Sequence, residues 1–192
     1  MPIEYTESAA ETRATYDATV AALVHKDALA GKTIHLQVET LGLKELANGA
    51  DLSAAKPSGC RFFTVQPDGS VVAADVADPG EYADTAKLRS LMRSNLAAET
   101  YERIVSADRL EALAAERYEA RLLSIPGIFV EALRVRSTDG GVEFVVPLVA
   151  SEPALNAQPV FKPDDFLAIA RSLAAERLEA WREIQNEPDG SA

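Results

Sequence analysis

The sequence has little of the chemistry on which hydrolytic enzymes and extracellular domains depend. Among its 192 residues there are one cysteine, Cys60, and two histidines, His25 and His35. A single thiol cannot form an internal disulfide, so nothing in the chain indicates an oxidising compartment. A nucleophilic serine or cysteine usually needs a histidine base. We expect both histidines at the surface, His25 near the end of a helix and His35 on the polar face of a strand, which argues against such a catalytic centre.

Metal and phosphate motifs are also lacking. The cysteine and the histidines do not have zinc spacing, and Asp75–Gly80 does not follow the alternation of a calcium loop. Gly31-Lys32-Thr33 looks like the end of a phosphate-binding loop, but Lys26 stands where that motif needs a glycine. The expected order of helix and then strand is also the reverse of what the motif requires. We therefore predict no metal and no cofactor.

Basic charge is scarce. The formal net charge is −11, from 30 acidic against 19 basic residues, which disfavours nucleic acid and anionic membranes as partners. No apolar run approaches the roughly 20 residues that a membrane span needs. The N-terminus has no positive cluster followed by an apolar stretch, so we predict no signal peptide and a cytoplasmic location. Alanine is abundant and arginine outnumbers lysine, which hints at a bacterial gene.

Two β-hairpins are the clearest elements that the sequence contains. In the first, Pro67 presets the backbone angle φ of the turn, and Asp68-Gly69 tolerates the left-handed residue that closes it. A second pair, Asp139-Gly140, marks the other hairpin. The strands expected beside the two turns are residues 60–65 and 71–76, and residues 128–136 and 142–149.

The other periodic segments complete a prediction of the fold class. Residues 33–39 alternate apolar and polar side chains as a half-buried strand does. Helical periodicity marks residues 8–30, 84–105, 106–124 and a last helix from Pro163. We therefore predict a single α+β domain over residues 1–192 with frayed tails at 1–7 and 187–192. Its largely antiparallel sheet of about five strands is covered by helices, in the order α-β-ββ-αα-ββ-α.

This element order resembles that of the small acidic chaperones of bacterial type III secretion, which run α-βββ-α-ββ-α. The segment Leu91–Leu96 before the second hairpin and the pair Trp181-Arg182 late in the last helix are also similar to them. The helix expected around 110–122 and the long loop 42–59 depart from that pattern. The resemblance implies a chaperone-like accessory domain that binds another protein.

Arginines on strands are the first candidate site residues. Arg134 and Arg136 share a strand face with Ile128, Val130 and Ala132, so this face is apolar at its start and cationic at its end. An anion or an acidic partner could bind there. The alternative is that both arginines are solvated or pair with nearby carboxylates. This alternative is favoured, because charged side chains on a strand face are usually solvated.

Three further side chains are candidates. Arg61 follows Cys60, and an arginine can lower the pKa of a thiol. A small buried cysteine is the commoner case, because free cysteine behaves as a small hydrophobe. Trp181, the only tryptophan, falls on the inward stripe of the last helix. We expect it in the core, and it becomes the best interface candidate if it is exposed.

Three functional hypotheses remain open. The first is a non-enzymatic interaction domain that binds another protein or a second copy of itself, as in a homodimer. The second is a small-molecule binder or an enzyme whose polar groups converge only in the folded chain. A deep pocket containing Arg61, Arg134 or Arg136 would support the second, and a solid core would remove it. The third, an acidic mimic of nucleic acid, is disfavoured because arginines interleave with the acids.

Overall fold

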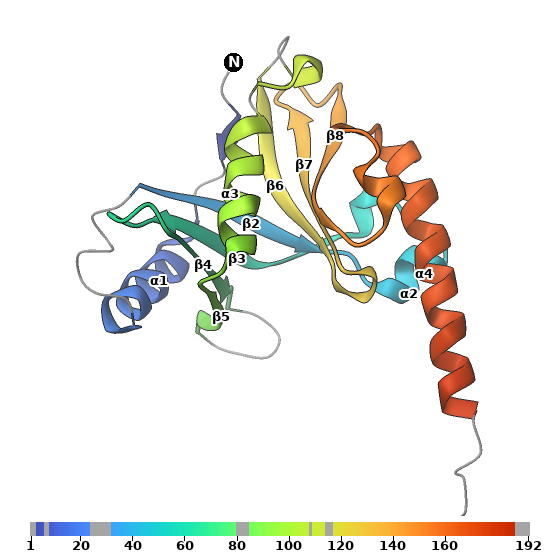
Figure 1. The fold of residues 1–192 in the computed structure, drawn as a ribbon, viewed down its shortest axis with the longest axis horizontal. Helices are drawn as coiled ribbons and strands as arrows, with labels where there is room; N and C mark the ends of the chain where they lie inside the picture. The colour runs from blue at the N-terminus through green and yellow to red at the C-terminus, as the bar shows by residue number, and fades with distance from the viewer. Residues whose placement is uncertain are drawn as a thin grey trace, which may run out of the picture.

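The computed structural model describes residues 3–5, 8–23, 32–79, 85–107, 109–113 and 117–186. Helices lie on both faces of one eight-stranded sheet (Figure 1). The strands are β1 (Glu4–Tyr5), β2 (Thr33–Thr40), β3 (Lys56–Val65), β4 (Val71–Ala77), β5 (Lys87–Met92), β6 (Tyr118–Ile125), β7 (Val130–Ser137) and β8 (Glu143–Ala150). The helices are α1 (Ala10–Leu23), α2 (Leu43–Ala47), α3 (Asn95–Ala107) and α4 (Pro163–Asn186), and the short 3-10 helices are η2 (Leu52–Ala54), η3 (Glu111–Leu113), η4 (Pro126–Ile128) and η5 (Pro153–Asn156).

The predicted sheet of about five, largely antiparallel strands is wrong. The strand order is β5-β4-β3-β2-β6-β7-β8, and β1 pairs with β6 beside this path. At the centre β2 runs parallel to β6, with Val38 opposite Leu122. The strand β1 is also parallel to β6, with Glu4 opposite Glu119. The two strands therefore follow one another along the same edge of β6, and the sheet is mixed.

Two of the added strands lie where the sequence predicted helices. The segment 84–105 contains β5 as well as most of α3, and the segment 106–124 contains most of β6. Leu110, Tyr118 and Leu122 were assigned to a helix because their spacing is a multiple of four. A spacing of four is also two steps of a strand, and Tyr118 and Leu122 both point to one buried face of β6. The spacing of the apolar residues therefore fits a helix and a strand equally well. Pairing with the neighbouring strands makes this segment a strand.

Both predicted hairpins are present. The strands β3 and β4 pair in antiparallel fashion, as do β7 and β8. Gly69 and Gly140 adopt positive φ angles of 83° and 77°, which a residue with a side chain rarely takes. In each turn an aspartate accepts a backbone hydrogen bond two residues on, Asp68 from Ser70 at 2.9 Å and Asp139 from Gly141 at 3.0 Å.

One face of the sheet is covered by α3. The apolar side of this helix, including Ala97 and Ile104, packs on Phe63, Leu122 and Leu133 from the middle of the sheet. In Figure 1 this helix crosses in front of the strands. Leu36, Ala120, Val135 and Leu148 extend the same buried layer.

The opposite face has two separate covers. Helix α1 packs on β3 and β4, where the rings of Tyr16 and Phe62 stack with their centroids 4.2 Å apart. Helices α2 and α4 cover the other end of this face, where Phe166 packs with Leu123 and Val145. The polar face of β2 lies between these two apolar clusters, and this leaves room for a charged network at the centre of the sheet.

Helix α4 continues past the part of the sheet that it covers (Figure 1). Leu167, Ala170 and Ala174 are buried as the sequence predicted. Trp181, expected in the core, instead leaves 49% of its surface exposed. The helical stripe is continuous, but the sheet ends before the stripe does. Glu4–Tyr5, within the first tail predicted to fray, forms β1, and the second tail at 187–192 lies outside the described residues.

Candidate functional site

An open cavity of about 300 Å³ lies between the N-terminal end of α3 and the sheet. Its walls are mostly apolar. Two of the lining residues, Leu96 and Phe129, have large hydrophobic side chains and leave 48% and 65% of their surface exposed. The cavity is lined by Arg61, Phe63, Met92, Leu96, Ala97, Thr100, Ser124, Pro126, Phe129, Val130, Glu131 and Val149.

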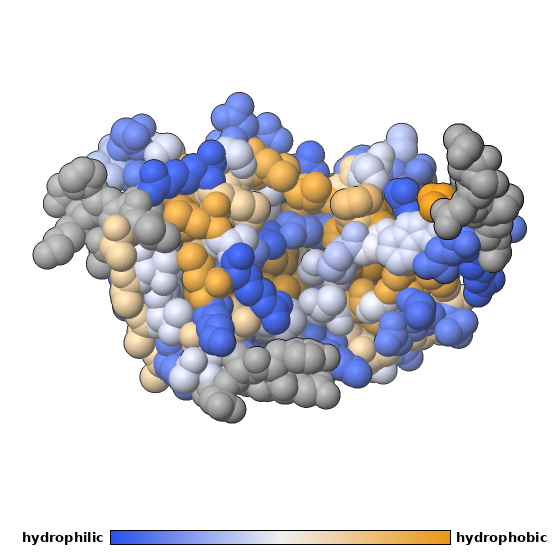
Figure 2. Space-filling model, turned by 90° about the horizontal axis from the view of Figure 1, so that it is seen from below, coloured by the Kyte–Doolittle hydropathy of each residue, from blue (hydrophilic) through white to orange (hydrophobic). Residues whose placement is uncertain are grey.

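A second cavity of about 500 Å³ adjoins the first. It lies between α3, the end of β8 and the segment 155–159, and Glu99 and Arg103 of α3 contribute to its wall. Both cavities are lined by Leu96 and Val149. We call the two together the α3 groove. Figure 2, which views the molecule from below relative to Figure 1, shows hydrophobic side chains in several groups with hydrophilic ones between them.

Phe129 stands at the rim of this groove in a strained conformation. It ends η4 with φ 53° and ψ 46°, and it is the only residue other than glycine with a positive φ in the described part of the chain. Such a backbone costs an ordinary residue about 1 kcal/mol or more. Its ring lies 5.6 Å from the guanidinium carbon of Arg177, a cation–π distance. The turn therefore holds an aromatic ring outward at a cost in backbone energy.

Arg61 lies at the floor of the groove between two carboxylates. Its Nε and Nη2 donate to Asp75 at 2.5 and 3.1 Å, and its Nη1 donates to Glu131 at 2.6 Å. Asp75 also accepts from the hydroxyl of Ser90 at 2.7 Å. Burial alone would lower the pKa of the guanidinium, but the bonds to both acids outweigh it and raise that pKa. We call Arg61, Asp75 and Glu131 the Arg61 cluster.

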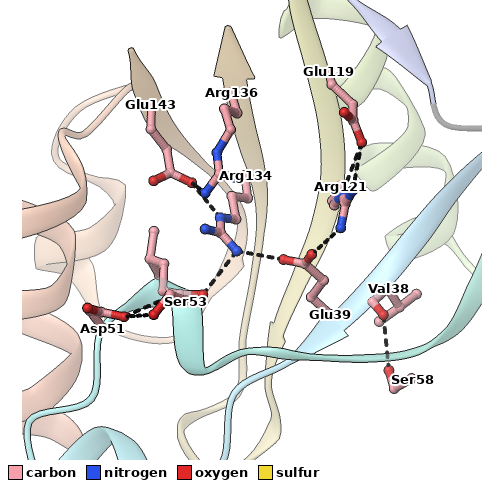
Figure 3. Close-up of polar contacts among 11 residues, drawn as sticks. Val38, Glu39, Asp51, Ser53, Ser58, Glu119, Arg121, Arg134, Arg136 and Glu143 are labelled. Atoms are coloured by element: carbon pink, nitrogen blue, oxygen red, sulfur yellow. Dashed lines mark hydrogen bonds and ion pairs between the residues drawn. The ribbon is translucent and has the colours of Figure 1, made fainter. Parts of the chain in front are cut away.

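Arg134 and Arg136 lie on the opposite face, in a second charged network (Figure 3). Glu39, which is buried, accepts from Arg134 at 2.8 Å and from Arg121 at 2.6 Å. Arg134 also donates to Glu143 at 2.5 Å and to the carbonyl of Leu52 at 2.9 Å. We call these side chains, with Arg136 and Glu119, the Arg134 network.

Charges in the Arg134 network balance, with Arg121, Arg134 and Arg136 against Glu39, Glu119 and Glu143. The cavity beside it measures only about 50 Å³. Burial would lower the pKa of Arg134, but its bonds to Glu143 and Glu39 raise it. Arg134 and Arg136 thus pair with nearby carboxylates. This is one of the two arrangements that the sequence left open for them, the other being a site for an anion or an acidic partner.

Neither Cys60 nor His35 lines the groove. Cys60 is buried beside Phe62, and burial, with a smaller contribution from the charge of Asp78, raises the pKa of its thiol to about 11. The Nε2 atom of His35 accepts a hydrogen bond from the backbone of Ser8 at 3.1 Å. His25 lies outside the described residues. The structure therefore brings neither the thiol nor the described histidine to the groove.

Of the candidates named from the sequence, Arg61 lines the groove, whereas Arg134, Arg136 and Trp181 do not. Leu96, Phe129 and Glu131 were not among the candidates. The apolar pattern includes Leu96, but nothing in it indicates that α3 leaves this side chain at a rim. For Phe129, the signal available was an aromatic residue directly after Pro126-Gly127, a turn sequence. The partnership of Glu131 with Arg61 joins strands that are distant in the chain, so no local pattern contains it.

Comparison with known proteins gives no family model, no curated protein and no solved structure that matches this chain. The order of elements also differs from the type III secretion chaperones, since four strands lie between α1 and α3 and three between α3 and α4. In the described part of the chain, no cluster of three or more His, Cys, Asp or Glu side chains could hold a metal ion. Its helices include none that is long and apolar enough to cross a membrane.

Proposed function

We propose that this chain is a non-enzymatic accessory protein that holds an apolar segment of another protein in the α3 groove. The observation that carries the proposal is the position of Leu96 and Phe129. These two large hydrophobic side chains are exposed at the rim of one cavity, and Leu96 also lines the adjoining one. Exposed apolar side chains grouped around a hollow are typical of a binding surface.

The energetics favour an apolar partner. Covering one large hydrophobic side chain contributes about 1.5–3 kcal/mol, so the two rim residues alone can support weak binding. Phe129 is held outward by a strained backbone, and a rigid aromatic group of this kind is a common anchor in protein interfaces. We place this binding in the cytoplasm, since the one cysteine cannot form an internal disulfide.

A random peptide library selected on the immobilised protein tests the proposal. Selected peptides should contain apolar residues and should bind the wild-type protein in solution. Leu96→Asp and Phe129→Asp should each weaken binding about tenfold or more, because each puts a charge on the apolar rim. Val142→Asp is the matched control, because Val142 is 37% exposed but lies at the hairpin end of β7 and β8, away from the groove. Equal binding by all four proteins would refute the groove as the site.

A small apolar molecule is the second candidate occupant. The cavity beneath Leu96 has about 300 Å³, the lower limit of typical ligand pockets. Native mass spectrometry of the purified chain would show a bound small molecule as an added mass that Phe129→Asp reduces. A co-purified molecule together with a failed peptide selection would favour this alternative over the peptide.

A further inference from the structure

The Arg61 cluster leaves one acceptor atom unused in the wall of the groove. Glu131 accepts from Arg61 through Oε2 only, and its Oε1 has no hydrogen-bond partner among the described residues. The side chain of Glu131 is 24% exposed and lines the cavity beneath Leu96. This oxygen is reachable from the cavity, so it can accept a hydrogen bond from a donor group of a ligand that displaces water.

Charge decides which donor fits. Arg61 carries one positive charge and its two partners, Asp75 and Glu131, carry two negative charges, so the cluster has a net charge of −1. The chain as a whole carries −11. A ligand cation would be attracted, and a ligand anion would have to displace a carboxylate from a buried arginine. The presence of an arginine in the pocket does not make it an anion site.

The shape of the site indicates which kind of cation fits it best. Glu131 offers one free oxygen, which suits a compact ammonium better than a guanidinium that prefers two parallel bonds. The wall around it is apolar, with Phe63, Met92 and Leu96 facing the same cavity. Phe129 adds an exposed aromatic ring at the rim, which extends the apolar wall. An aliphatic stem that ends in an ammonium matches all of these surfaces.

On this basis, and resting on the proposed function, we infer that the cavity beneath Leu96 receives a primary ammonium on an aliphatic stem. In the bound segment this group is a lysine side chain. The stem packs on Leu96 and Phe129, and the ammonium donates to Oε1 of Glu131. A free alkylamine has the same chemistry and would bind in the same position.

Titration of the wild-type protein with three six-carbon probes tests this directly. Hexylammonium, hexan-1-ol and hexanoate are followed by NMR at one pH and constant ionic strength. Both hexylammonium and hexan-1-ol can donate a hydrogen bond to Glu131, but only the ammonium adds a charge of opposite sign, which should make it bind about tenfold tighter. Hexanoate should bind most weakly. Binding of hexan-1-ol or hexanoate as tight as that of hexylammonium would overturn the inference.

A pair of variants localises the effect. Glu131→Gln removes the charge but keeps an acceptor oxygen, so it should lower hexylammonium affinity about tenfold and hexan-1-ol affinity much less. Glu119→Gln is the control, because Glu119 also pairs with an arginine but lies in the Arg134 network on the opposite face. An equal loss in both variants would contradict the assignment. If Glu131→Gln does not fold, the comparison of the three probes on the wild-type protein still tests whether the cavity prefers an ammonium.

Matched peptides separate the two proposals. One peptide selected on the groove is made with lysine, with norleucine and with glutamate at the same position. The lysine form should bind about tenfold tighter than the norleucine form. Equal binding of these two forms keeps the groove as a peptide site but overturns the ammonium. Hexylammonium binding without binding of any peptide supports the ammonium site and refutes the segment as its source.

Discussion

Glu39 and Arg134, 95 residues apart in the chain, form a buried ion pair in which Nη1 of the arginine donates to Oε2 of the glutamate at 2.8 Å. Their side chains are 6% and 9% exposed. The second oxygen of Glu39 accepts from Arg121, and Arg134 also reaches the carbonyl of Leu52. The pair therefore ties β2, β6 and β7 to η2, between the two apolar clusters on this face of the sheet.

Removal of Arg134 should destabilise the chain much more than removal of Arg121. Arg134→Met leaves the buried Glu39 short of one partner and Glu143 without its closest one, and we expect a loss of about 3 kcal/mol. Arg121→Met should cost about 1 kcal/mol or less, because this side chain is 36% exposed. Urea unfolding of the two variants measures both losses. Similar losses would show that burial does not set the strength of this network.

Replacement of Phe129 should separate stability from binding. Asparagine tolerates the left-handed backbone that phenylalanine adopts here. Phe129→Asn should therefore leave the free energy of unfolding unchanged or raise it by up to about 1 kcal/mol, even after loss of the contact with Arg177. The same variant should bind selected peptides more weakly. A less stable variant with intact binding would mean that the ring serves packing and not the groove.

Trp181 and Phe166 lie on the same helix in opposite environments. Phe166 is fully buried and Trp181 is 49% exposed. Phe166→Ala should cost about 3–5 kcal/mol through the cavity that it leaves. Trp181→Ala should cost about 0.5 kcal/mol, the range of a surface change. Thermal unfolding at two protein concentrations checks this, because a large, concentration-dependent loss in Trp181→Ala would indicate self-association through the exposed end of α4.

The thiol of Cys60 should be inert at neutral pH. With a pKa of about 11, only about 0.1% of this buried group is thiolate at pH 8. Reaction with a disulfide reagent should be slow in the native protein and fast in urea. Rapid native labelling at pH 8 would show that the thiol is accessible and activated.

The same pKa fixes a dependence of stability on pH. The folded state raises the pKa of the Cys60 thiol above its unfolded value of about 8.5. The neutral thiol therefore contributes its full stability below about pH 8.5, and this contribution falls as the pH rises towards 11. Between pH 8.5 and pH 10.5, Cys60→Ala should lose less stability than the wild type. Parallel loss in both proteins would contradict the shift.

Local patterns predicted the local parts of this molecule. The pairs Asp68-Gly69 and Asp139-Gly140 identified both hairpins, because a turn depends on a few adjacent residues. The buried positions Leu167, Ala170 and Ala174 followed from helical periodicity. What the sequence did not predict depends on pairing between distant segments. The strand β6 was assigned to a helix because Tyr118 and Leu122 fit both periods.

The candidate site was predicted least well, for the same reason. Arg61 was a candidate, but its partner Glu131 lies 70 residues further along the chain. Trp181 was assigned to the core because its helical stripe is regular, and the stripe does not reveal where the sheet ends. Exposure of Leu96 and Phe129 is a property of the assembled layers.

The parallel position of β2 beside β6 constrains how the chain is made. Val38 pairs with Leu122, so the centre of the sheet cannot form until the ribosome has released the chain through β6. Until then the N-terminal strands expose an unpaired edge, and such contacts between distant segments also slow folding. A chain truncated before β6 should therefore aggregate more readily than the whole chain, because its apolar sheet face and strand edge stay uncovered.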